Sequence, residues 1–172
     1  MSSFACEKDH DIENFLREQA VRFELIGKSR TFLIYDEDEL DNGRFSILGY
    51  FTLALKSLFL PDIVSNRKRF KLDGFSSKWN DEPVRDIPCY LIGQLAKNSN
   101  IDIPKNILNG RDLINMSCEK IRQSAENTAG RWILVECHNH PKLLSFYIDN
   151  GFKYAFKEPD DSDDLVQLIR GI

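Results

Sequence analysis

The sequence lacks the marks of several protein classes. No apolar run approaches the ~18 residues of a membrane-spanning helix, and the N-terminus has no basic segment followed by an apolar one. The four cysteines form no CxxC pair. The net charge of −4 gives no general attraction to nucleic acid, so a polyanion site requires a local basic patch. These absences predict a cytoplasmic protein without a membrane segment.

Length and composition are those of an ordinary globular domain. The chain has 172 residues, of which 42% are hydrophobic and 29% charged, and it can bury one sizeable core. Three of the four cysteines lie in apolar runs, as buried free thiols do in a reducing compartment. We therefore expect a single domain over residues 1–172.

The first 60 residues predict a helix followed by two strands. Asp11 can cap a helix that Gly27 ends, with one apolar face. A short strand over 31–35 and a long one over 45–58 follow, separated by an acidic turn at 36–43. The apolar face of the helix comprises Ile12, Phe15, Leu16, Ala20 and Phe23.

Residues 61–86 interrupt this pattern. Proline, glycine and serine residues recur here, which predicts a long inserted loop within the domain. The loop carries a basic cluster, Arg67, Lys68 and Arg69, with Lys71 close behind. Such a cluster is either a solvated surface or a contact for a polyanionic substrate.

The rest of the chain alternates strands with helices. Residues 87–96 and 131–137 predict buried strands, and a helix begins at Gly110 between them. A second helix ends at Phe146-Tyr147, and a last strand spans 165–169. The sequence therefore predicts an α/β fold.

The order of these elements resembles the GNAT N-acetyltransferase superfamily over nearly the whole chain. The resemblance is nearest to the prokaryotic toxins that acetylate aminoacyl-tRNA. It implies a mixed, mostly antiparallel central sheet flanked by helices on both faces. The segments that carry it are Asp-Ile-Glu-Asn-Phe-Leu (11–16), Ser-Arg-Thr-Phe (29–32), Leu-Gly-Tyr-Phe-Thr-Leu-Ala (48–54), Ile-Pro-Cys-Tyr-Leu-Ile-Gly-Gln-Leu-Ala (87–96) and Phe-Tyr-Ile-Asp-Asn-Gly-Phe (146–152).

The resemblance implies an acetyl-CoA site. The pantetheine arm is expected to bond to backbone groups near Leu95 and Lys97, like an added strand. The pyrophosphate is expected on the free N–H groups at the helix start, where the dipole favours an anion. These cofactor-binding residues are Asn109, Gly110, Arg111, Asp112 and Leu113.

The helix start departs from the family motif Gln/Arg-x-x-Gly-x-Gly/Ala. The matching positions hold Ile107, Gly110 and Asp112, so one signature glycine remains. The Asp112 carboxylate can cap the helix or repel a phosphate, and Lys105 and Arg111 can offset its charge. A degenerate cofactor site is therefore the alternative to an active one.

Tyr147 is the candidate catalytic residue. In the family, the matching tyrosine lies near the thioester sulfur and protonates the departing thiolate. The alternative is an aromatic core residue packed beside Phe146 and Phe152, and one tyrosine can do both. Glu136 is a weaker candidate base, and the Cys137–His140 segment has no second cluster, so no metal is expected.

These residues predict acetyl-CoA-dependent N-acetyl transfer to a primary amine. Aminoacyl-tRNA is one candidate acceptor, with Arg30, Arg67, Lys68 and Arg69 contacting its phosphates, and the acidic net charge argues against it. The resemblance also implies a homodimer and a small antitoxin as candidate partners. The rival hypothesis is a catalytically degenerate GNAT-fold binding or regulatory protein.

Overall fold

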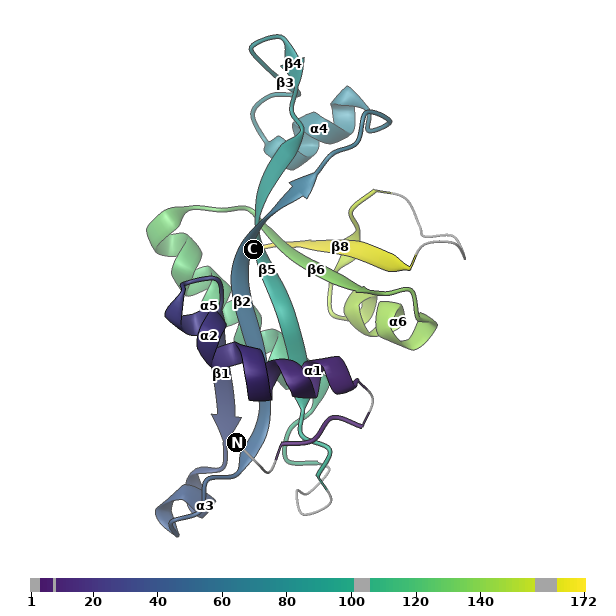
Figure 1. Ribbon diagram of the computed structural model, residues 1–172. Coiled ribbons are helices and arrows are strands. Elements are labelled where there is room, and N and C mark those ends of the chain that lie inside the picture. The colour runs from purple at the N-terminus through teal and green to yellow at the C-terminus, as the bar shows by residue number, and fades with distance from the viewer. Residues whose placement is uncertain (1–3, 8, 101–105, 157–163) are drawn as a thin grey trace. The chain divides into compact units, whose positions relative to one another are not determined.

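The structure is a computed structural model that describes residues 4–7, 9–100, 106–156 and 164–172 (Figure 1). It divides into two compact units: a first unit of Met1–Ala54 and Ile92–Asn127, and a second unit of Leu55–Leu91 and Thr128–Ile172. In chain order, the elements are α1 (His10–Asn14), the π-helical turn η1 (Phe15–Gln19), α2 (Ala20–Leu25), β1 (Arg30–Tyr35), α3 (Glu37–Asp41), β2 (Ile47–Phe59), α4 (Asn66–Asp73), β3 (Lys78–Trp79), β4 (Glu82–Pro83), β5 (Asp86–Lys97), α5 (Gly110–Thr128), β6 (Trp132–His138), α6 (Pro141–Asp149), β7 (Lys153–Tyr154) and β8 (Leu165–Gly171).

Six strands form one sheet in the order β1-β2-β5-β6-β8-β7. The pairs β1–β2, β6–β8 and β7–β8 are antiparallel. Because β2 and β5 each run from one unit into the other, the first unit holds β1 with one part of both strands. The second unit holds their remaining parts with β6, β8 and β7. The predicted α/β class with a mostly antiparallel sheet is confirmed.

Helices cover both faces of the sheet in the first unit. In the β1–β2 pair, Leu33 lies opposite Tyr50, and the neighbouring Phe32 lies opposite Phe51. Leu33 and Tyr50 pack in a core with residues of α1, η1 and α2. Phe32 and Phe51 stack at 5.0 Å between ring centroids and pack with Leu113 of α5. Successive strand residues point to opposite faces, so the two helical layers lie on opposite sides here.

The N-terminal helical segment begins earlier than its sequence indicates. Asp9, and not the predicted Asp11, caps α1: its Oδ1 accepts the N–H groups of Asp11 at 2.9 Å and Ile12 at 3.4 Å. Asp11 lies inside the helix, where its carboxylate suits the positive end of the dipole. Gly27 ends the segment in the left-handed conformation, with φ +68°, as predicted.

The predicted acidic turn at 36–43 contains a short helix instead. Asp36 caps α3 by accepting the N–H of Glu39 at 3.2 Å. Three carboxylates in its first turn lie at the positive end of the helix dipole, which favours them. The turn is therefore confined to Asn42-Gly43, where Gly43 has φ +78°.

Residues 61–86, predicted as a loop, contain their own secondary structure. Ser65 caps α4, which ends at Gly74 with φ +90°. β3 and β4 form a hairpin whose turn residues, Asn80 and Asp81, have φ values of 50° and 65°. Positive φ at both central residues is the geometry of a type I′ turn.

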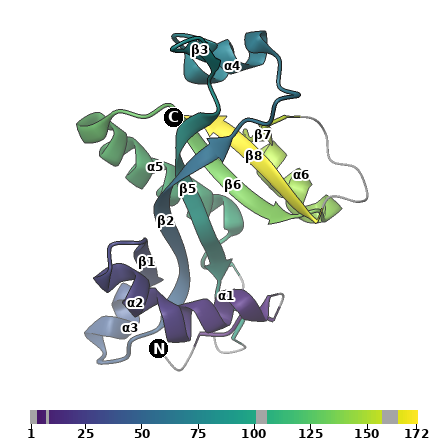
Figure 2. The ribbon, with the colours of Figure 1, turned by 45° about the horizontal axis from the view of Figure 1, so that its top comes forward.

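The second unit is built on one apolar core. Trp132 and Leu134 of β6 contribute to it, and α6 lies beside β6 (Figure 2). All four cysteines of the chain are buried and take part in no disulfide. Among the described residues, no helix is long and apolar enough to cross a membrane. The buried residues of this core are Leu58, Leu60, Leu72, Ile87, Cys89, Trp132, Leu134, Ala155 and Ile169.

Candidate functional site

The start of α5, in the first unit, is closed by a reciprocal cap. The N–H of Asn109 donates to Oδ2 of Asp112 at 2.9 Å, and the N–H of Asp112 donates to Oδ1 of Asn109 at 3.1 Å. This is the geometry of a capping box, with aspartate in place of the usual glutamate. Asp112 therefore binds its own helix and occupies one of the donors expected for a pyrophosphate.

Two donors remain at this helix start. The N–H groups of Gly110 and Arg111 lie in the first turn and have no partner among the described residues. α5 is 19 residues long, so the partial positive charge at its N-terminus is fully developed. The site retains the capacity to bind an anion, because two N–H groups remain and Arg111 adds a positive charge, although the Asp112 carboxylate opposes an anion there. Lys105, the other cation predicted to offset Asp112, lies outside the described residues.

Lys97 adds a second cation beside the helix start. Its Nζ donates to the carbonyl of Leu108 at 3.1 Å, one residue before the cap. Leu108 itself packs over Gly49: a Cβ at Gly49 would lie 2.7 Å from Leu108 Cδ2 and 2.9 Å from the Ala96 carbonyl oxygen. Gly49 thus permits the close approach that brings Leu108, and the helix start after it, against β2.

Leu95 takes part in the same region of the first unit. Its side chain is half-buried and packs with the core of Leu48, Phe51, Leu108 and Leu113. The predicted contact of the Leu95 and Lys97 backbone with pantetheine remains a prediction. Among the predicted cofactor residues, the structure brings Lys97 together with residues 109–113 through Leu108.

Tyr147, in the second unit, is packed as an aromatic core residue. Its ring makes edge contacts with Phe146 at 5.2 Å and Phe152 at 5.5 Å between centroids, and 8% of the residue is exposed. Burial raises the pKa of Tyr147, with a smaller contribution from the Cys137 thiol. Its hydroxyl makes no hydrogen bond within the described part of the chain, so it is free to donate to a bound group.

Glu136 belongs to a polar row that the sequence did not indicate. Its Oε1 accepts from Nε2 of Gln167 at 2.8 Å, and its Oε2 pairs with the ammonium of Lys56. The three residues come from β6, β8 and β2, all in the second unit. A carboxylate held by an ammonium and an amide is fixed in orientation, which distinguishes Glu136 from a freely solvated strand-end residue.

The predicted phosphate contacts differ in environment. Arg30 is exposed and pairs with Glu24 at 2.6 Å. Arg67 is exposed and Lys68 is half-buried on α4. Arg69 is 2% exposed, and its guanidinium donates to the carbonyls of Val64, Leu60, Val84 and Pro61. Four of its five N–H groups are thus used inside the protein, which removes Arg69 from the set available to a phosphate.

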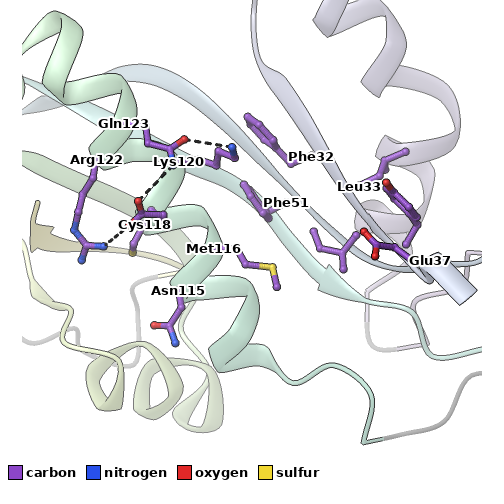
Figure 3. Close-up of a pocket in the computed structure, with 13 residues that line it drawn as sticks. Phe32, Leu33, Glu37, Phe51, Asn115, Met116, Cys118, Lys120, Arg122 and Gln123 are labelled. Carbon is purple, nitrogen blue, oxygen red and sulfur yellow. Dashed lines mark hydrogen bonds and ion pairs between the residues drawn. The ribbon is translucent and has the colours of Figure 1, made fainter.

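The first unit also has a hollow of about 740 Å³ between β1 and the middle of α5 (Figure 3). Phe32, Phe51 and Met116 supply its apolar lining. Its cations already have partners, because Lys120 donates to Gln123 and Arg122 pairs with Glu119. None of the predicted site residues lines it. This hollow therefore adds nothing to an anion-binding site.

A metal site finds no support in the side chains that the structure describes. They contain no group of three or more histidine, cysteine, aspartate or glutamate residues arranged to hold an ion. In the Cys137–His140 segment, Cys137 is buried and His138 is exposed, since adjacent strand residues point to opposite faces.

The comparisons with known proteins bear on the fold. No protein-family model matches the chain, and no curated protein matches it. AtaT complexed with acetyl-methionyl-tRNAfMet superposes with a TM-score of 0.69 at 17% identity, over 96% of this chain and 85% of AtaT. A KacT mutant superposes with a TM-score of 0.69 at 19% identity, over 96% of this chain and 85% of the KacT chain. AtaTR bound with AcCoA superposes with a TM-score of 0.68 at 18% identity, over 95% of this chain and 83% of the matched chain.

AtaT and KacT are toxins with the GNAT fold. At these identities the match shows the fold, and it extends over most of both chains. The predicted GNAT-like architecture is therefore confirmed.

Proposed function

We propose that this chain is an acetyl-CoA-dependent N-acetyltransferase that moves an acetyl group to a primary amine by direct transfer. The observation that carries the proposal is the fold match to AtaT, which has been solved with AcCoA and with an acetylated methionyl-tRNA. In this proposal residues 1–172 act as one acetyltransferase domain, in which 61–86 is an inserted segment.

The pyrophosphate of acetyl-CoA binds the start of α5. Gly110 and Arg111 offer N–H groups, and the cations of Lys97 and Arg111 balance the Asp112 carboxylate. Backbone groups of Leu95 and Lys97 bond the pantetheine arm. One N–H aimed at the thioester oxygen contributes about 3 kcal/mol to stabilising the tetrahedral intermediate.

Tyr147 acts on the leaving sulfur. The neutral amine attacks the thioester carbon, the tetrahedral intermediate collapses, and the C–S bond breaks to release CoA thiolate. Because burial raises the pKa of Tyr147, its hydroxyl stays protonated at neutral pH and donates to the developing thiolate. The attacking amine releases one proton to solvent and Tyr147 regains one from solvent, so amine and thioester become amide and thiol with no net change in protons. Solved forms of AtaT and KacT carry a tyrosine-to-phenylalanine substitution, which fits such a role.

Calorimetric titration with acetyl-CoA tests the proposal directly. We expect saturable binding, and the absence of binding at about millimolar ligand would exclude an acetyl-CoA enzyme of this kind. Release of CoA thiol is then followed with a panel of primary amines and with aminoacyl-tRNA. AtaT was solved with such a tRNA, so this acceptor is the first to be assayed.

The same comparison supports a proposal on a protein partner. AtaT has been solved with the C-terminus of the antitoxin AtaR, and KacTA with DNA. We propose a small antitoxin and a second copy of the chain as partners here. Expression that is harmless to the host, with charged tRNA left unmodified, would exclude the toxin role and leave a small-molecule amine or a protein N-terminus as acceptor.

A second candidate is a non-catalytic GNAT-fold binding or regulatory protein. The capping box of Asn109 and Asp112 favours it, because it occupies part of the pyrophosphate site. This candidate predicts a stable fold that transfers acetyl to no amine in the panel. Thiol release with any amine excludes it.

A further inference from the structure

The β3–β4 hairpin and the end of α4 border a hollow of about 670 Å³ within the second unit. The hairpin lies beside α4 in Figure 1 and in Figure 2. Two strongly exposed aromatic side chains line this hollow, Phe75 at 81% and Trp79 at 69%. Apolar surface gathered in one hollow marks an interaction site, unlike exposed apolar residues that are scattered singly. The hairpin hollow is lined, among others, by Asp73, Phe75, Trp79, Glu82, Val84 and Asp86.

The segment that carries the two rings is held by its own hydrogen bonds. Oδ2 of Asp73 accepts the N–H groups of Phe75 at 3.1 Å and Ser76 at 2.8 Å, just where α4 ends. The Ser76 hydroxyl donates to the carbonyl of Lys78 at 2.6 Å, and the N–H of Lys78 donates back to that hydroxyl at 3.1 Å. The rings are therefore exposed on a fixed backbone, so a ligand binds them at a small cost in conformational entropy.

One wall of the hairpin hollow belongs to the core of the second unit. Val84 packs against that core, and its carbonyl accepts from the buried guanidinium of Arg69. The N–H of Val84 donates to the carbonyl of Ser77 at 2.9 Å. The hollow is therefore formed before any ligand binds, as binding sites usually are.

Unpaired carboxylates line the hairpin hollow together with the two rings. Trp79 and Glu82 are direct cross-strand partners, so their side chains lie on the same face of the hairpin. Glu82 and Asp86 form no ion pair with any residue that the structure describes. Among the described lining residues the one cation is Arg85, which pairs with Asp62 at 2.5 Å. The hollow thus combines aromatic faces with negative charge, which is the environment that a cation prefers.

We propose that the hairpin hollow docks a basic segment of a partner protein. A lysine or arginine side chain of that segment lies against Trp79 and Phe75, and Glu82 and Asp86 hold its charge. An apolar or anionic partner fits less well, because it would cover both carboxylates without a counter-charge. A small free cation also fits less well, since the exposed rings leave the hollow too open to enclose one. The inference goes beyond the proposed function and does not depend on it.

Fluorescence anisotropy with a labelled peptide of alternating arginine and glycine tests the docking, with the full chain and without acetyl-CoA. We expect saturable binding at about 10–100 µM that weakens as salt rises. The same peptide with glutamine in place of arginine should not bind at about 1 mM, because it offers no charge to the carboxylates.

Glu82→Gln/Asp86→Asn separates the hairpin hollow from the general negative charge of the protein. The variant should bind the arginine peptide about tenfold more weakly than the wild type. The matched control is Asp38→Asn/Asp41→Asn, which removes two exposed carboxylates of α3 in the first unit. It should stay within about twofold of the wild type.

Substitutions of Trp79 test the aromatic contact. Trp79→Ala should weaken binding about tenfold, whereas Phe45→Ala, at a ring of the first unit that is 49% exposed, should change it by about twofold or less. Trp79→Phe keeps an aromatic ring and should keep most of the affinity. Peptide binding should change the tryptophan emission of the wild type and leave that of Trp79→Phe unchanged, because Trp132 is buried. This readout remains valid where Trp79→Ala lowers the stability of the protein.

Four results overturn the proposal. The wild type binds no arginine peptide at about 1 mM, or it binds the glutamine peptide equally well. The hollow variants and their controls lose the same affinity, which would show attraction to the net charge alone. N-acetylarginine methylamide binds as tightly as the peptide, which would make the ligand a small cation. Calorimetric titration of the same preparation with acetyl-CoA reports on the proposed function independently.

Discussion

Asn109 and Asp112 cap the start of α5 reciprocally, each accepting the backbone N–H of the other at 3.1 Å and 2.9 Å. The cap holds a carboxylate where the proposed function requires a pyrophosphate. It leaves the N–H groups of Gly110 and Arg111 for a ligand. The charge of the Asp112 side chain therefore decides between the two candidate functions, an acetyltransferase and a catalytically degenerate relative.

The substitution Asp112→Asn tests how much the negative charge of Asp112 weakens acetyl-CoA binding. The amide keeps an oxygen that accepts the N–H of Asn109, so the cap is retained at a cost of about 1 kcal/mol or less. Removing the negative charge should tighten acetyl-CoA binding about fivefold, the effect of about 1 kcal/mol of repulsion. Calorimetry gives the dissociation constants. Glu119→Gln, further along the same helix, is the control and should change nothing; unaltered affinity in Asp112→Asn means that the phosphates bind elsewhere.

Tyr147→Phe separates catalysis from packing. The ring contacts with Phe146 and Phe152 are kept, and the lost hydroxyl has no hydrogen bond among the described residues, so stability should change by less than about 0.5 kcal/mol. Turnover should fall about tenfold or more, with acetyl-CoA affinity within about twofold. Thiol-release kinetics measure both. Tyr154→Phe is the control, and full activity of Tyr147→Phe would leave Tyr147 a packing residue only.

The sequence predicted the long elements because their periodicity is strong. The expected strands at 45–58, 87–96 and 131–137 correspond to β2 (Ile47–Phe59), β5 (Asp86–Lys97) and β6 (Trp132–His138). The sequence did not predict the limits of short elements that depend on a helix cap. Asp36 caps α3 within the acidic stretch after β1, and Asp9 caps α1 before the predicted cap at Asp11. The GNAT-like order of elements could be predicted because the long elements that define it are strongly periodic.

The candidate site was less predictable, since its contacts join distant positions. Lys56 and Glu136 are 80 residues apart and meet only once the strand order is fixed. Arg69 looked like a surface cation, but the carbonyls around it come from the chain before α4 and from Val84, after β4. The cap between Asn109 and Asp112 was readable in principle, because three residues separate a capping-box pair.

Arg69→Met should destabilise the second unit. The substitution removes the donors for four backbone carbonyls that lie near Leu60 and Val84. We expect a loss of about 2–4 kcal/mol in the free energy of unfolding, measured by urea denaturation. Arg67→Met, two positions away at an exposed site of α4, should cost less than about 0.5 kcal/mol. Equal effects of the two substitutions would show that the guanidinium contacts carry no net stability.

Gly49→Ala should disturb the helix start from a distance. The added methyl would lie 2.9 Å from the carbonyl oxygen of Ala96, a backbone atom that cannot yield easily, and 2.7 Å from Leu108. We expect destabilisation of about 1–3 kcal/mol and weaker acetyl-CoA binding, because Leu108 precedes the cap. Gly171→Ala is the matched control, since nothing lies within 4 Å of a Cβ there. A neutral Gly49→Ala would mean that Leu108 moves freely and does not fix the helix start.

Alkaline pH should destabilise the protein through its buried thiols. Burial raises the pKa of Cys89 and of Cys137 from 9.0 to about 11, with a backbone hydrogen bond to Leu58 opposing the shift at Cys89. Between these values the unfolded chain has lost thiol protons that the folded chain still holds. The free energy of unfolding therefore falls as pH rises through this window, by up to about 1.4 kcal/mol per pH unit and thiol, and is unaffected by these groups below it.

Urea denaturation under reducing conditions, at steps from neutral pH to pH ~11, measures this slope. Cys137→Ala removes one titrating group, so the variant should start less stable at neutral pH yet lose stability less steeply above it. The buried hydroxyls of Tyr50 and Tyr147, whose pKa burial also raises, extend the decline above pH ~10. A stability that stays constant across the thiol window would show that water reaches both cysteines in the folded chain.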